Sequence, residues 1–221
     1  MAAVVVIVDV LRFTTAASVA VARNAMVFPY PLRDDGAAYA AAHDAVLAGR
    51  REDGNLSLSP VALDGIEPGT RLVLPSPNGS ALAFAAHALG VGVVLAGSLR
   101  NATAVGRAAV VASEGGTIAV IAAGEHDRAG HLRMAVEDLT GGGAVIAGAV
   151  AAGARPSDAA QGALETFATA APDLPGWLGA CASGRELIGW GWDDDVAFAA
   201  EHDVTTVVPV LRAGAFVPLE S

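Results

Sequence analysis

Five short runs of aliphatic residues, separated by alanine-rich stretches, constrain the fold of this chain most. The runs are "VVVIV" (4–8), "AMVFPY" (25–30), "RLVLP" (71–75), "VGVVLAG" (91–97) and "TIAVIAAG" (117–124). Runs without alternating polar residues are typical of strands buried on both faces, as in parallel sheets covered by helices. The stretches between them predict helices at residues 14–23, 34–49, 79–89, 102–112 and 134–152. We therefore expect a three-layer α/β/α fold with a parallel or mixed central sheet.

The rest of the chain completes this pattern without dividing it. Residues 50–70 are rich in Gly, Pro, Ser and Asp, which indicates a loop. A mostly helical region follows residue 152 and ends near residue 202, and residues 204–219 predict a two-stranded hairpin. No internal repeat or linker interrupts the sequence, so we expect a single domain spanning residues 1–221.

The basic residues exclude several classes of protein. All 13 basic side chains of the 221-residue chain are arginine, so the lysine of a Walker P-loop, a Schiff-base enzyme or a pyridoxal enzyme is missing. The formal net charge of −10 argues against nucleic acid or an anionic membrane as a general partner. A local cationic pocket and a homo-oligomer are both compatible with this charge.

Cys181 is the only cysteine, which excludes an intramolecular disulfide and a cysteine-based zinc site. This usage fits a reducing cytosol. The apolar start lacks a basic segment and reaches Asp9 too early for a signal peptide. The run at residues 140–154 is too short and glycine-rich to cross a bilayer about 30 Å thick. We expect a soluble cytoplasmic protein with no membrane partner.

Polar residues follow four of the five predicted strands. In open α/β sheets, ligands bind beyond the carboxyl ends of the strands, so these residues are the site candidates. In chain order they are Asp9, Arg12, Thr14 and Thr15; Asn78, Gly79 and Ser80; Gly97, Ser98, Arg100 and Asn101; Glu125, His126, Asp127 and Arg128; then Glu137 and Asp138.

Each candidate also has a structural interpretation. Thr14, Asn78, Ser80 and Asn101 are good helix N-caps, and helices need caps whatever the function. Gly79 and Gly97 are also consistent with ordinary turns. Asp9 would be costly to bury without a partner, and a structural pair with Arg12 would supply one.

Taken together, the candidates predict a pocket for a small polyanion and a metal. Several helix N-termini would point to one edge of the sheet, each with free N–H groups and partial positive charge. Arg12, Arg100 and Arg128 would add planar donors suited to phosphate, carboxylate or sulfonate. Carboxylates provide the oxygen ligands preferred by a hard cation such as Mg²⁺, and three are available: Asp9, Glu137 and Asp138.

An ordered set of motifs resembles the 2-phosphosulfolactate phosphatase (ComB-like) family. The motifs are "VVVIVDVLRFTTAASVA", "LPSPNGSALA", "GSLRNATAV", "AVEDLTGGGAVI" and "SGRELIGWGWDDDVAFAAEHDVTTVVPVL", and they cover nearly the whole chain. The resemblance implies a magnesium-dependent phosphatase that converts 2-phosphosulfolactate to sulfolactate and phosphate, a step toward coenzyme M. It also implies a three-layer α/β/α fold. A phosphatase for another small phosphorylated hydroxy acid and a non-catalytic anion-binding homologue are the alternatives.

The resemblance also implies roles for residues that match the motifs. Asp9 and Arg12 take catalytic roles, and Asp9, Glu137 and Asp138 are the metal ligands. The late acidic motif contributes Asp194 and Asp195, for which helix capping is the alternative. The substrate-binding residues are Thr14, Thr15, Asn78, Gly79, Ser80, Ser98 and Asn101.

Three features depart from the family pattern. Family members usually carry a further segment ahead of the first strand, whereas this sequence starts at that strand. A loop that usually has Gly-Glu-Arg followed by Gly-Asn-Ser-Pro is "GRREDGNLSLSP" here, which leaves the exact substrate open. The usual "TTNGT" is "SPNGS", a change that keeps a hydroxyl group.

Two mechanisms remain open for Asp9. It would either attack phosphorus to form an aspartyl phosphate or hold magnesium that activates water. Known aspartyl-phosphate phosphatases carry a second Asp two positions later and a lysine; here the position is Leu11 and lysine is absent, which favours the metal role. His126 and His131 are candidate proton donors, with solvent-exposed loop histidines as the alternative. Trp177, Trp190 and Trp192 are expected to pack the helical region, with a pocket lid as the alternative for one of them.

Overall fold

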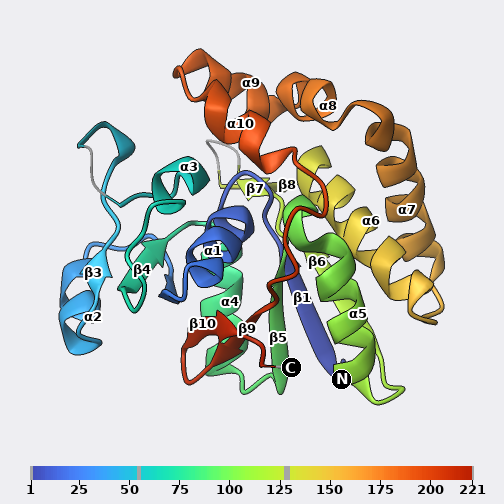
Figure 1. Ribbon diagram of the computed structural model, residues 1–221, viewed down its shortest axis with the longest axis horizontal. Coiled ribbons are helices and arrows are strands. Elements are labelled where there is room, and N and C mark those ends of the chain that lie inside the picture. Colours follow the sequence, from blue (N-terminus) through green and yellow to red (C-terminus); the bar gives the residue numbers. More distant parts are fainter. Residues whose placement is uncertain (1, 54–55, 127–129, 221) are drawn as a thin grey trace.

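The computed structural model describes residues 2–53, 56–126 and 130–220 and contains a mixed eight-stranded sheet between helical layers (Figure 1). The strand order is β3-β4-β2-β10-β9-β5-β1-β6. A separate two-stranded sheet pairs β7 (Glu125–His126) with β8 (Leu132–Arg133). The main strands are β1 (Val4–Val8), β2 (Met26–Tyr30), β3 (Val46–Leu47), β4 (Arg71–Pro75), β5 (Val93–Gly97), β6 (Ile118–Ala122), β9 (Pro209–Arg212) and β10 (Ala215–Pro218).

Helices cover both faces of the sheet, which confirms the predicted α/β/α layering. The α-helices are α1 (Phe13–Ala22), α2 (Gly36–Ala42), α3 (Pro60–Leu63), α4 (Gly79–Ala88), α5 (Ala102–Ser113), α6 (Val136–Ala151), α7 (Asp158–Ala170), α8 (Leu174–Ala180), α9 (Ala182–Gly189) and α10 (Asp193–Ala199). Short 3₁₀ turns are η1 (Arg51–Asp53), η2 (Leu99–Asn101) and η3 (Ala171–Asp173).

The two faces of β1 show how the layers form. Val6 and Val8 belong to the apolar cluster that includes Val105 of α5 and Val145 of α6. Ile7 points the other way, into the cluster with Phe13 of α1. Because alternate residues of a strand face opposite sides of the sheet, an all-apolar strand is buried by helices on both sides. Figure 1 shows α5 and α6 on one side of β1 and α1 on the other.

The predicted C-terminal hairpin is present, and it lies in the middle of the sheet. β9 pairs antiparallel with β5 through Val210 and Leu95, and β10 pairs antiparallel with β2 through Phe216 and Val27. The hairpin therefore joins two groups of parallel strands, β6-β1-β5 and β2-β4-β3.

Two predictions for residues 34–70 were wrong in part. The predicted helix at 34–49 ends at Ala42, and Asp44 has a positive φ of 48°. The chain then forms β3 instead of continuing the helix. The predicted loop at 50–70 contains α3, which begins after Ser59 because the Ser59 hydroxyl accepts a hydrogen bond from the Ala62 amide.

None of the helices in the described part of the chain is long and apolar enough to cross a membrane.

Candidate active site

Asp9 lies directly after β1 and is 3% exposed. Its Oδ1 accepts the amide of Phe13 at 3.1 Å, and its Oδ2 accepts the amide of Gly79 at 2.8 Å. Phe13 and Gly79 are the first residues of α1 and α4, so two helix N-termini meet at this carboxylate. Helix N-termini favour negative charge, which gives the buried Asp9 carboxylate backbone partners. The Ser76 hydroxyl lies 3.5 Å from Oδ2 and adds a weaker contact.

Two acids at the start of α6 lie near Asp9. Asp138 accepts the amide of Val10 at 2.8 Å on Oδ1 and the amide of Gly124 at 3.0 Å on Oδ2. It therefore fastens the segment after β6 to the segment after β1. Glu137 is 3% exposed and lies near the Cys181 thiol, whose pKa it helps to raise.

The buried acids raise one another's pKa values. Burial raises the pKa of Asp9, and the charge of Glu137 adds to this, against the lowering effect of the Gly79 and Phe13 amides. The pKa of Asp138 lies well above its ordinary value because of burial, followed by the charge of Asp9. Burial also raises the pKa of the Cys181 thiol to about 12, so the thiol is neutral at pH 7. Negative charge at this end of β1 is therefore costly, and a cation or a proton there is favoured.

Arg12 follows Asp9 in the chain and is more exposed than Asp9. Its Nη1 donates to Oδ2 of Asp195 at 2.7 Å, and Asp195 is fully buried at the first turn of α10. The same oxygen lies 2.9 Å from Nη1 of Arg51, and Oδ1 of Asp195 accepts the hydroxyl of Ser59 at 2.5 Å. One buried carboxylate thus binds three side chains from the turn after β1 and from the 51–59 segment. The structural alternative for Asp9 was a pair with Arg12, but in the structure Arg12 pairs with Asp195.

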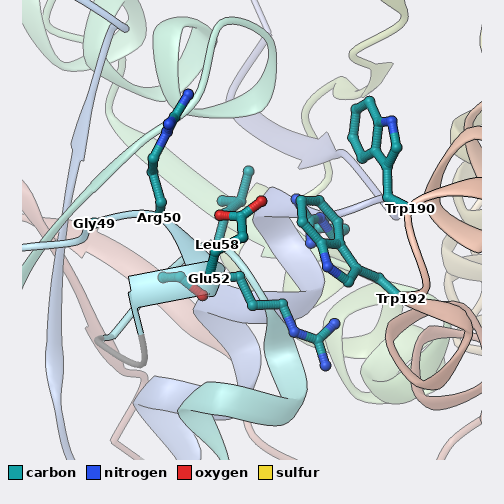
Figure 2. A pocket seen from close by; sticks show the side chains of 9 residues that line it. Gly49, Arg50, Glu52, Leu58, Trp190 and Trp192 are labelled. Atoms are coloured by element: carbon teal, nitrogen blue, oxygen red, sulfur yellow. The ribbon is translucent and has the colours of Figure 1, made fainter.

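Arg12 and Arg51 line a pocket of about 530 Å³. Figure 2 shows Glu52 and Trp192 facing one another across it, while the Arg50 side chain points away from them. The Arg12 guanidinium carbon lies 4.8 Å from the centre of the Trp192 ring. A pocket of this size admits a small organic anion. The lining residues are Arg12, Gly49, Arg50, Arg51, Glu52, Ser57, Leu58, Trp190 and Trp192.

A family model of 2-phosphosulpholactate phosphatase matches residues 1–214. The chain belongs to the 2-phosphosulpholactate phosphatase family. This is a family of phosphoric monoester hydrolases. The matched range includes the Asp9 site, the Arg12–Asp195 pair and the whole lining of the pocket.

Among the substrate-binding residues predicted for this phosphatase, Gly79 and Asn78 lie at the Asp9 site. The Gly79 amide contacts Asp9 directly, and a Cβ atom at position 79 would lie 2.7 Å from the Asp9 Cβ. Asn78 Oδ1 lies 3.2 Å from Nδ1 of His126, which places one candidate proton donor next to this turn.

The hydroxyls of Thr14 and Thr15 are fully buried and bind the backbone around Asp9 instead of lining the pocket. Thr14 Oγ1 donates to the carbonyl of Asp9 at 2.8 Å and accepts its amide at 2.8 Å. Thr15 Oγ1 donates to the carbonyl of Val10 at 2.8 Å. In the phosphatase these hydroxyls set the shape of the turn that carries Asp9.

Ser80, Ser98 and Asn101 also make internal hydrogen bonds. Ser80 Oγ accepts the Tyr30 amide at 2.6 Å and lies 2.9 Å from the Leu74 carbonyl oxygen, so it joins the ends of β2 and β4. Asn101 Oδ1 accepts the amide and hydroxyl of Ser98, and its Nδ2 donates to the carbonyl of Val207 at 3.0 Å. All three side chains are fully buried. Ser98 and Asn101 form a capping box at η2, but Asn101 makes no side-chain capping bond at α5, and Ser80 does not occupy the N-cap position of α4.

Magnesium was predicted at Asp9, Glu137 and Asp138. The structure brings these carboxylates close enough for their charges to interact. Within residues 2–53, 56–126 and 130–220, no three His, Cys, Asp or Glu side chains form a group that could hold a metal ion. Mg²⁺ commonly takes one or two carboxylates, water and substrate phosphate rather than an all-protein cage, so the hard oxygen donors and the excess negative charge remain suitable for it.

Sequence reasoning missed Arg51, Ser59 and Ser76 and left Asp195 open to a capping role. The doubled arginine in "GRRED" was the available signal for Arg51, and the "DDD" run was the signal for Asp195. Arg100 lies elsewhere, paired with Glu201 and stacked on Phe198. Asp127 and Arg128 lie outside the described residues.

Proposed function

We propose that this protein is a magnesium-dependent phosphatase that hydrolyses 2-phosphosulfolactate to sulfolactate and inorganic phosphate, as in coenzyme M biosynthesis. The family match supports the class of reaction. The observation that carries the proposal is the position of Arg12. It lies three residues after the buried Asp9 in the sequence, and its side chain lines a 530 Å³ pocket beside a second arginine. The substrate is small and carries phosphate, carboxylate and sulfonate, for which guanidinium groups are suited donors.

In this proposal, Arg12 binds the phosphoryl oxygens and neutralises the charge that develops on them. The Gly79 and Phe13 amides hold the Asp9 carboxylate in place at the mouth of β1. Asp9 and Glu137 would bind magnesium, which would polarise the phosphoryl group and lower the pKa of a water nucleophile. His126, held beside Asn78, would protonate the leaving alkoxide.

The test is phosphate release from racemic 2-phosphosulfolactate with Mg²⁺ and with excess EDTA, beside phospholactate and p-nitrophenyl phosphate. The proposal expects fast release from 2-phosphosulfolactate that stops in EDTA. Release from phospholactate alone would indicate another phosphorylated hydroxy acid as the substrate, and no release from any compound would indicate an anion-binding homologue.

A second readout isolates the metal from catalysis. Calorimetric titration of Mg²⁺ into the wild-type protein and into Asp9→Asn and Glu137→Gln should show binding in the wild type and loss in both variants. Equal Mg²⁺ binding by all three proteins would contradict the assigned ligands, even if the enzyme is active.

A further inference from the structure

We propose that Arg51 forms a second anion subsite in the pocket, which binds the sulfonate or carboxylate of the substrate while Arg12 binds its phosphate. This inference rests on the proposed function and assigns the site a requirement for substrates with two separate anionic groups. It is carried by four features of the structure: the shared carboxylate of Asp195, the place of Arg51 in the pocket lining, the wall formed by Trp192, and the distribution of charge.

Asp195 places the two arginines side by side. Nη1 of Arg12 and Nη1 of Arg51 lie 2.7 and 2.9 Å from the same Oδ2 atom. The carboxylate is fully buried and its other oxygen accepts the Ser59 hydroxyl, so its position is fixed from a third direction. One negative charge therefore orients two positive charges, and each guanidinium keeps further N–H donors for a ligand.

Arg51 makes an ion pair with Asp195 that lacks ideal hydrogen-bond geometry. Its Nη1 is buried and close to Asp195, but it lies outside hydrogen-bond geometry and has no hydrogen-bond partner among the described residues. Arg51 lines the pocket, so an anion bound there would lie beside its positive charge.

Trp192 forms a wall against which both arginines lie. The guanidinium carbons of Arg12 and Arg51 are 4.8 and 5.8 Å from the centre of its ring. A cation near an aromatic face is stabilised by the ring, which also limits the ways in which the guanidinium can turn. Both arginines and the tryptophan line the pocket.

The two arginines of the pocket come from different segments of the chain. Arg12 is close in sequence to Asp9, the acid of the proposed phosphate chemistry, whereas Arg51 comes from the separate η1 turn. Asp194 binds Nη2 of Arg51 at 2.5 Å from the outer side and is about half exposed. Arg51 is thus held by two acids and also lines the pocket.

The test compares two substrates and two variants. Arg51→Gln should lower kcat/KM for 2-phosphosulfolactate by about 10- to 100-fold, mainly through KM, because one charged hydrogen-bonding group is lost. With p-nitrophenyl phosphate, which has no second anionic group, the same variant should change kcat/KM by less than about 3-fold. Arg107→Gln is the charge-matched control, because Arg107 is exposed on α5. It should change neither value.

Equal losses on both substrates, or no loss on either, would overturn the inference. Arg51→Lys keeps the charge but not the planar fork, and it should lose activity on 2-phosphosulfolactate as well. Thermal unfolding of each variant shows whether it is folded.

A binding measurement separates this inference from the proposed function. Sulfolactate carries the sulfonate and the carboxylate, either of which Arg51 would bind, but no phosphate. Calorimetry should therefore detect its binding to the wild type and a loss of affinity of about 10-fold or more in Arg51→Gln. If the wild type hydrolyses nothing but still binds sulfolactate through Arg51, the phosphatase proposal fails and the subsite stands. If hydrolysis is fast and sulfolactate binding does not depend on Arg51, the subsite fails alone.

Discussion

The amide of Gly79 donates a hydrogen bond to Oδ2 of Asp9 at 2.8 Å, and a Cβ atom at position 79 would lie 2.7 Å from the Asp9 Cβ. The contact joins the start of α4 to the end of β1, segments that are 70 residues apart in the chain. Glycine is required because any side chain at this position would push the carboxylate away.

Gly79→Ala should therefore displace Asp9 and lower phosphate release by about 100-fold, the effect expected of a small misplacement in an active site. It should also lower the free energy of unfolding by about 1–3 kcal/mol through overpacking. Steady-state kinetics and urea unfolding measure the two effects.

The matched control is Gly162→Ala in α7, where a Cβ atom meets nothing within 4 Å. This variant should keep full activity and gain about 0.5–1 kcal/mol of stability from the loss of a helical glycine. A Gly79→Ala enzyme as active as this control would contradict the account of Asp9.

Asp9→Asn should reduce phosphate release by about 100- to 10,000-fold, in the range for loss of a group that acts in the chemical step. The amide side chain has one acceptor oxygen, so it cannot accept both the Phe13 and the Gly79 amides. Far-UV circular dichroism should show a folded protein. Asp34→Asn, a change at an exposed acid, should leave the rate unchanged, and a wild-type rate in Asp9→Asn would refute the role of Asp9.

The buried acids predict a dependence of stability on pH. Burial raises the pKa of Asp9 and of Asp138 in the folded state above the ordinary value of about 3.9. A raised folded-state pKa gives stability that is fully present below the ordinary pKa and is lost as pH rises through the raised pKa. These two groups should therefore lower the free energy of unfolding from about pH 4 upward.

Asp138→Asn removes one of the two groups, so its unfolding free energy should fall less steeply with pH than that of the wild type. Urea unfolding at several pH values between about 4 and 7, in EDTA, measures the two slopes. Asp34→Asn, at an exposed position, serves as the reference. Parallel curves for the wild type and Asp138→Asn would contradict the raised pKa.

Much of the fold follows from the sequence, because an all-apolar run such as Val4–Val8 has to be buried on both faces. The same reasoning placed Asp9 and Arg12 at the carboxyl end of a strand, where the structure has them. The position of the C-terminal hairpin between β2 and β5 did not follow, because strand order depends on pairings between distant segments.

The site was predictable only in its local parts. Thr14, Ser80 and Asn101 were ambiguous between capping and ligand binding, since a hydroxyl or amide serves either purpose; their burial and internal partners are visible only in the structure. The contact between Arg51 and Asp195 spans more than half the chain and leaves no periodic pattern in the sequence. This contact is visible only in the folded structure.

Gly143 shows why the glycine-rich run of α6 matters to packing. A Cβ atom at this position would lie 2.1 Å from the carbonyl oxygen of Ala163 in α7. Gly143→Ala should therefore push the two helices apart and lower the unfolding free energy by about 1–3 kcal/mol, measured by urea unfolding. Gly162→Ala is again the control, and equal stability of the two variants would contradict this close approach of α6 and α7.

Asp195→Asn tests the ion-pair group that shapes the pocket. Removing one member of a buried ion pair leaves its partners without compensation, and here both Arg12 and Arg51 lose their shared carboxylate. The free energy of unfolding should fall by about 3–5 kcal/mol. KM for 2-phosphosulfolactate should rise because the arginines lose their orientation. The neighbouring Asp194 is about half exposed and pairs with Arg51, so Asp194→Asn should cost about 0–1 kcal/mol, and less in high salt. Equal effects of the two substitutions would show that burial of Asp195 does not set the strength of these contacts.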